Sequence, residues 1–147
     1  MRAAELFEQC AADVRELNAI MSAEWEWEGP RPSGGGRPSG IGDPTAAQAI
    51  ANSQRMADLE TRREELQGSI AFCGELVDGL RLLMGAEYAD VLELLYIDLR
   101  TWDYIADYYG RVHGCGRRRI YDYRRAAFDM VDGLGIAHIR MASGIAT

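Results

Sequence analysis

The chain has 147 residues, a formal net charge of −7 and a hydrophobic content of 48%. This length suits one domain, or a small domain with an extended helical element, and no apolar run approaches the ~20 residues of a membrane-spanning helix. The N-terminal segment is charged and amphipathic and lacks the apolar core of a signal peptide, so we expect a cytoplasmic protein without membrane partners.

Cysteine usage argues against a disulfide framework. The three cysteines, Cys10, Cys73 and Cys115, are widely spaced and odd in number. Cys10 and Cys73 also fall on apolar helical stripes, where a free cysteine packs as a small hydrophobic residue.

The first predicted element is an N-terminal helix, assigned to residues 1–28. Its apolar residues recur at alternating spacings of four and three, which places them on one helix face: Ala3, Phe7, Cys10, Val14, Leu17 and Met21. Residues 29–44 contain six glycines and four prolines. This composition is incompatible with regular structure and predicts a flexible linker.

A long helix is predicted at 45–84, where Asp43 can cap the free amides and Pro44 suits the first helical position. Its internal glycines weaken an isolated helix, so it needs a partner helix. The N-terminal helix, folded back through the linker, is the nearest candidate. A 3-4 spacing typical of a coiled coil predicts a homo-oligomer through this helix, unless its N-terminal end frays. The spacing joins Ala49, Asn52, Met56, Leu59, Arg63, Leu66, Ile70, Cys73, Val77, Leu80 and Met84.

Two short helices are predicted next, after a break at Gly85. The first covers about 87–98 and carries an apolar side. A tight link at Leu99 and Arg100 leads to Thr101, a natural N-cap for a helix at 102–109, which we expect to end at Gly110.

The last strong helix is predicted at 117–131, after a glycine-rich turn at 111–116. Residues 133–147 form a tail, either a short helix or a mobile end. We expect the two helices around the turn to be held together by core residues, which are Trp102, Ile105, Tyr109, Ile120, Ala127 and Phe128.

The charge of the chain reverses around this turn. Residues 1–99 contain 8 arginines and 18 acidic residues, a balance of −10, whereas residues 111–125 contain 6 arginines and one aspartate, a balance of +5. Such a reversal is typical of a nucleic-acid-binding element, although a solvated basic face that offsets acidic helices is the alternative. The candidate DNA-binding residues are Arg111, Arg117, Arg118, Arg119, Tyr121, Asp122, Arg124 and Arg125.

Their positions suggest different roles. In helix-turn-helix docking, N-terminal residues of the second helix reach base edges in the major groove. Consecutive residues point about 100° apart on a helix, so one or two of the arginines at 117–119 would read bases and the rest would contact phosphate. Tyr121 and Asp122 lie near the same surface. Arg124 and Arg125 are better placed for phosphates.

Residues 87–131 resemble region 4 of sigma-70-type factors. That pattern has an amphipathic helix, a capped helix beginning Ser/Thr-Trp/Tyr-x-x-Ile-Ala, a glycine turn and an arginine-rich helix, matched here by 92–98, 101–106 and 120–127. The whole chain also resembles short phage and prophage transcriptional regulators, including late-gene activators. The resemblance implies an all-α fold, in which a helical hairpin or coiled coil precedes a helix-turn-helix domain at 86–132. It also implies double-stranded DNA and RNA polymerase as partners.

One spacing departs from this family, which usually has about five residues between the turn glycine and the apolar residue that opens the recognition helix. Here nine residues separate Gly110 from Ile120, unless Gly114 is the turn glycine.

Other functions find less support. His113 and Cys115 lack a second ligand pair at zinc spacing, so we expect no metal or other cofactor, and no Ser or Cys has a base placed to activate it, so we expect no enzyme. Small terminase subunits, which adapt DNA for packaging, also join a helix-turn-helix to an oligomerising hairpin, but usually in the opposite order. A helical interaction protein that docks an acidic partner is the third possibility.

Overall fold

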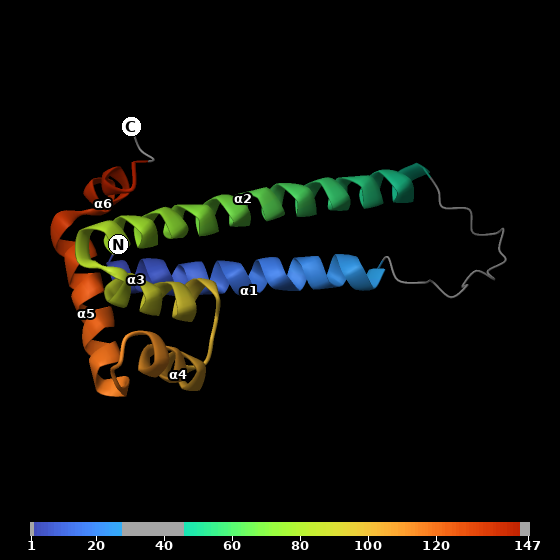
Figure 1. Ribbon diagram of the computed structural model, residues 1–147. Coiled ribbons are helices and arrows are strands. Elements are labelled where there is room, and N and C mark those ends of the chain that lie inside the picture. Colours follow the sequence, from blue (N-terminus) through green and yellow to red (C-terminus); the bar gives the residue numbers. More distant parts are fainter. Residues whose placement is uncertain (1, 28–45, 145–147) are drawn as a thin grey trace. The chain divides into compact units, whose positions relative to one another are not determined.

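The computed structural model describes residues 2–27 and 46–144, which form helices and short links with no strand among them (Figure 1). The predicted all-α class is therefore confirmed. The predicted linker at 29–44 and the cap at Asp43 lie outside the described residues. No helix in the described part of the chain is both long enough and apolar enough to cross a membrane. The elements are α1 (Ala3–Trp27), α2 (Ala46–Met84), α3 (Ala86–Leu92), η3 (Glu93–Ile97), α4 (Trp102–Val112), α5 (Arg117–Leu134) and α6 (Ile136–Ala142).

The chain divides into two compact units, one made of residues 1–14 and 69–147 and the other of residues 15–68. The boundary falls inside both α1 and α2, so each of these helices contributes to both units. In the unit at 15–68, the Glu16 carboxylate accepts a hydrogen bond from Nε of Arg62 at 2.7 Å, and this bond lowers the pKa of Glu16. The chain therefore folds back on itself between α1 and α2.

The predicted heptad positions of α2 differ in burial along its length. In the unit at 15–68, Leu66 is buried, whereas Ala49, Asn52 and Met56 are exposed. In the other unit, the later positions of the pattern are buried, namely Cys73, Val77 and Leu80. The pattern thus packs within the chain only from about Leu66 onward, and the homo-oligomer through this helix stays a prediction.

Phe7, on the first turns of α1, lies at the centre of the larger unit. Its ring is fully buried and contacts Tyr96 of η3 at 5.7 Å and Phe128 of α5 at 5.8 Å between ring centroids. Cys10 and Cys73 are free and buried in this core, as the sequence predicts. The hydrogen bond with Cys10, together with burial, raises the pKa of the Cys73 thiol.

The helix predicted at about 87–98 is an α-helix, α3, that continues as one π-helical turn, η3. Gly85 adopts φ +117° and separates α3 from α2, as predicted. At the other end, Leu99 adopts φ +53°, a left-handed conformation that is unusual for leucine. The next amide, of Arg100, donates to the carbonyl of Leu94 at 2.8 Å. The chain therefore reverses within the two residues expected to form a tight link.

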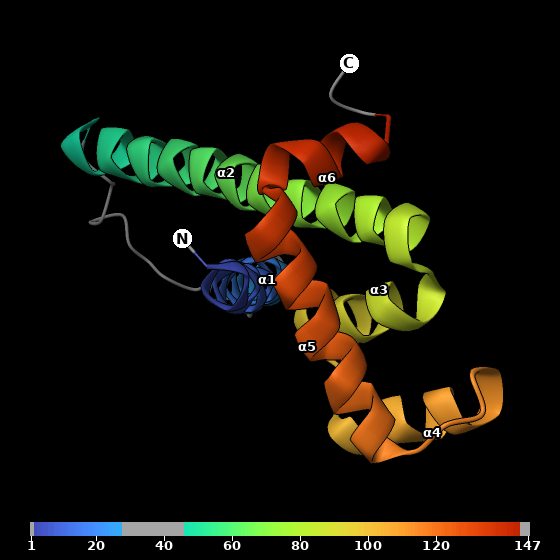
Figure 2. The ribbon, with the colours of Figure 1, turned by 90° about the vertical axis from the view of Figure 1, so that its left-hand side faces the viewer.

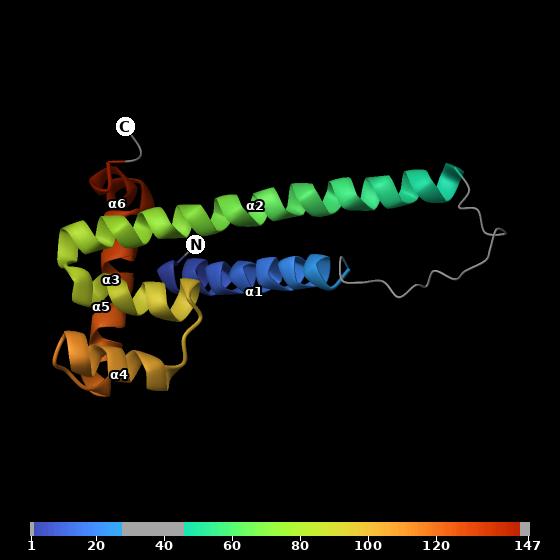
Figure 3. The same ribbon diagram turned by 45° about the vertical axis from the view of Figure 1, so that its right-hand side comes forward.

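Within the region predicted as a tail, α6 forms a short helix that packs on the C-terminal part of α2 (Figure 3). Ile139 is fully buried against Gly79, where an added Cβ would lie 2.1 Å from the Ile139 carbonyl oxygen. Arg140 pairs with Glu75 at 2.6 Å, and its guanidinium lies 4.5 Å from the centre of the Phe72 ring. The absence of a side chain at Gly79 is what permits this close approach.

Candidate nucleic-acid interface

Helix α4 lies beside the N-terminal part of α5 (Figure 2). Each of the two helices carries buried apolar residues, among them Ile105 of α4 and Ile120 of α5. The Thr101 hydroxyl accepts a hydrogen bond from the Tyr104 amide at 3.1 Å, so the predicted N-cap of α4 is confirmed. Of the predicted core residues, Ile105, Tyr109, Ile120 and Ala127 have no exposed surface, whereas Trp102 and Phe128 are half-buried. These contacts fix the crossing of the two helices.

The turn between the helices is shorter than predicted. Helix α4 continues through Gly110 to Val112, so the expected end at Gly110 is wrong. The chain reverses at Gly114, which has φ +68°, and the amides of His113 and Cys115 both donate to the Tyr109 carbonyl, at 2.9 and 3.3 Å. Five residues then separate Gly114 from Ile120.

A buried carboxylate that sequence reasoning missed holds this turn to α3. Oδ2 of Asp90 accepts a hydrogen bond from the Tyr108 hydroxyl at 3.0 Å and lies 3.0 Å from Nε2 of His113. Its Oδ1 accepts from Arg81 of α2 at 3.1 Å. Burial, then the bond to Asp90, raises the pKa of Tyr108, so its hydroxyl stays a donor. His113, considered above as a metal ligand, instead anchors the turn.

The basic residues at the start of α5 lie mainly on its exposed side. Arg118, Arg119 and Arg125 are exposed and form no ion pair with any residue that the structure describes. Asp122 and Tyr121 are exposed beside them. Three of the predicted arginines therefore form one accessible cationic surface over the first turns of α5.

The other predicted arginines are engaged within the unit. Arg117 pairs with Asp103 at the start of α4, and Arg111 pairs with Asp107 one turn earlier in its own helix, at 3.0 Å. Arg124 is half-buried, and its guanidinium lies 5.3 Å from the Trp102 ring centre.

Tyr121 completes a cluster with Arg124 and Trp102. The Tyr121 ring centre lies 5.6 Å from the Arg124 guanidinium and 4.8 Å from the Trp102 ring centre. Cation–π and ring contacts therefore join the start of α4 to the second and third turns of α5.

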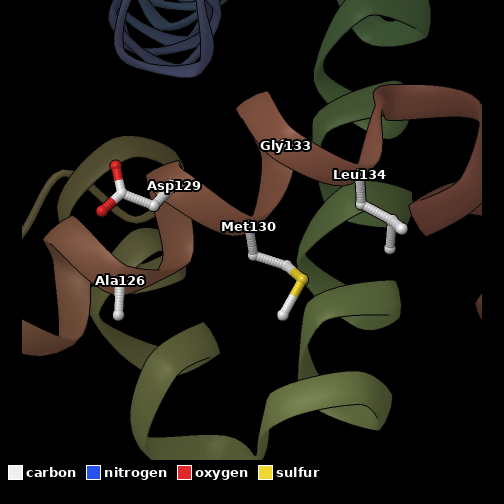
Figure 4. Close-up of a pocket in the computed structure, with 5 residues that line it drawn as sticks. All are labelled: Ala126, Asp129, Met130, Gly133 and Leu134. Atoms are coloured by element: carbon white, nitrogen blue, oxygen red, sulfur yellow. The ribbon is translucent and has the colours of Figure 1, made fainter.

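A shallow hollow of about 510 Å³ on α5 is lined by Ala126, Met130 and Leu134, which point to one side of the helix, and by Gly133 and Asp129 (Figure 4). Asp129 is its only titratable residue. Among the side chains that the structure describes, at 2–22 and 46–144, no three from His, Cys, Asp or Glu are placed to hold a metal ion.

No family model, curated protein or solved structure matches this chain.

Proposed function

We propose that this protein is a sequence-specific transcription regulator that binds double-stranded DNA through α4, the turn and α5, with the start of α5 in the major groove. The observation that carries the proposal is the exposed and unpaired state of Arg118, Arg119 and Arg125 on a helix held against a capped partner helix. In an acidic chain, such a surface attracts phosphate where the rest of the molecule repels it.

The charge along α5 favours one direction of approach. Its first nine residues carry five arginines and one aspartate, whereas its C-terminal half carries Asp129 and Asp132 and no basic residue. The N-cap, Gly116, provides no side-chain hydrogen bond, so the positive end of the helix dipole is open to an anion. DNA would therefore meet the N-terminal turns of α5, as it does in helix-turn-helix docking.

The geometry refines the roles of the candidate residues. We assign phosphate contacts to Arg118, Arg119 and Arg125, and Tyr121 and Asp122 lie between Arg118 and Arg125 on the same side of α5. Arg124 acts inside the unit, because it is half-buried against Trp102. The assignment of a promoter as the target comes from the resemblance to sigma region 4, which also supplies RNA polymerase as a further partner.

The turn geometry supports that resemblance. With Gly114 as the turn glycine, five residues precede Ile120, which is the spacing usual in the family of phage regulators. The capped start of α4 at Thr101 occupies the position of the Ser/Thr that opens the second helix in that pattern.

Selection from a random duplex library tests the proposal. The wild-type chain should enrich a defined sequence, since Arg117, which is not assigned to phosphate, would read guanine from the start of a recognition helix. The variant with Arg117→Ala, Arg118→Ala and Arg119→Ala should enrich none. Recovery of no sequence by the wild type, or of the same sequence by both proteins, would contradict the proposal.

A further inference from the structure

Arg117 differs from Arg118, Arg119 and Arg125 because it is paired with a carboxylate, that of Asp103. It is the first residue of α5, and its terminal nitrogen donates to the carboxylate of Asp103, in the first turn of α4. The Arg117 side chain remains 51% exposed, and that of Asp103 is 90% exposed. This pair thus lies on the surface proposed to meet DNA.

Asp103 has a fixed backbone position. The residue before it, Trp102, packs on Tyr121, and Thr101 caps the same helical turn. Asp103 and Arg117 are therefore brought together by the packing of α4 on α5, and not by a loop that can move away.

Pairing changes what Arg117 can recognise. A phosphate carries a full negative charge and is attracted to a free guanidinium, but much less to a neutral arginine–aspartate pair. Guanine presents two neutral acceptors in the major groove, and a guanidinium has five N–H donors, of which Asp103 occupies only some. The pair therefore loses attraction for the backbone while it keeps donors for a base.

We propose, building on the DNA-binding function above, that Asp103 is a positioning residue that makes Arg117 a reader of guanine. Asp103 holds the guanidinium in one orientation and repels phosphate from it. It thereby raises the ratio of specific to non-specific affinity, although its own charge opposes binding.

The variant Asp103→Asn tests this inference, with Asp107→Asn as the matched control, because Asp107 is an exposed carboxylate on the same helix that pairs with a different arginine, Arg111. Affinities are measured by fluorescence anisotropy for the duplex recovered by selection and for a scrambled duplex of the same composition. Circular dichroism checks that both variants fold.

In Asp103→Asn we expect tighter binding to the scrambled duplex and a salt slope steeper by about 0.9, since Arg117 gains a phosphate contact. The dissociation constant for the scrambled duplex divided by that for the selected duplex should fall about tenfold, which is within the discrimination of one bidentate arginine–guanine contact. In Asp107→Asn the ratio should stay unchanged, and Asp103→Glu should restore most of it.

Equal changes in the two asparagine variants would overturn the inference and leave DNA binding intact, since general charge removal would then explain both. An unchanged ratio in Asp103→Asn would overturn it in the same way. Failure of the wild-type chain to bind either duplex would overturn the proposed function and the inference together.

Discussion

Nε2 of His113 lies 3.0 Å from Oδ2 of Asp90, and both side chains are almost fully buried. This contact joins the turn before α5 to α3. The same carboxylate binds Arg81 and Tyr108, so one residue holds three elements at the base of the proposed DNA-binding surface.

Loss of this carboxylate should destabilise the protein. We expect Asp90→Asn to lower the free energy of unfolding by roughly 1–3 kcal/mol, because Arg81, Tyr108 and His113 would lose the carboxylate that they share, although Arg81 keeps Asp78 and Glu93. Asp129→Asn, an exposed carboxylate on α5, should change it by less than about 0.5 kcal/mol. Urea denaturation measures the free energy of unfolding of both variants. A loss in Asp90→Asn no larger than that in Asp129→Asn would show that the Asp90 network does not stabilise the protein.

Replacement of two glycines near the turn by alanine should change the stability of the protein in opposite directions. Gly114 has φ +68°, so Gly114→Ala should destabilise by about 1–2 kcal/mol. Gly110 lies inside α4 with nothing within 4 Å of an added Cβ, so Gly110→Ala should stabilise by about 0.5–1 kcal/mol. Thermal unfolding distinguishes the two, and a loss at Gly110 would mean that the turn glycine is Gly110 after all.

A second glycine pair tests the docking of α6. In Gly79→Ala the new methyl group would meet the Ile139 backbone, so we expect a loss of about 1–3 kcal/mol and faster amide exchange over 136–142. Gly74→Ala, on the same helix with open space around it, should be neutral or stabilising. Unaltered exchange in α6 of Gly79→Ala would contradict the packing described here.

Glu93 predicts a pH dependence. Burial raises the pKa of this carboxyl above its ordinary value of 4.5, even though Arg81 opposes the shift. Because the pKa of this carboxyl is higher in the folded than in the unfolded protein, Glu93 stabilises the folded state at a pH below 4.5. This contribution is lost as the pH rises through the pKa of the folded protein. Glu93→Gln should therefore raise the melting temperature at pH 7 relative to the wild type, and this gain should shrink at pH 4. A difference in melting temperature between Glu93→Gln and the wild type that grows on acidification would contradict this prediction.

Much of the helical architecture can be predicted from local patterns, for physical reasons. The apolar spacing of α1 and the capping residue Thr101 act within a few residues of the chain, so the sequence displays them directly. The same holds for the breaks at Gly85 and before Arg117.

The features that could not be predicted depend on contacts between distant residues. Asp90 lies beside apolar residues in its helix, and only the approach of Arg81, Tyr108 and His113 gives it a role. Likewise, glycine content alone cannot say that Gly110 stays helical while Gly114 turns, because the turn is fixed by hydrogen bonds to the Tyr109 carbonyl.

In the candidate site, too, local sequence patterns predict some features, whereas others depend on contacts between distant residues. The position of the arginines on the first turns of α5 follows from helical periodicity. Which arginines are free depends on α4, whose Asp103 and Trp102 engage Arg117 and Arg124. The acidic residues of 102–109 indicate that some arginines could be paired, but the sequence alone does not say which arginine each of them pairs with.

The salt dependence of DNA affinity tests the central claim most directly. The wild type is compared with Arg118→Ala/Arg119→Ala/Arg125→Ala and with a control, Arg2→Ala/Arg15→Ala/Arg55→Ala, which removes three exposed arginines outside α5. We predict that the α5 variant loses at least about tenfold in affinity for the selected duplex, and that its log–log salt slope falls by about 0.9 per lost phosphate contact. The control should match the wild type. Equal affinity and slope in all three proteins would contradict DNA binding through α5.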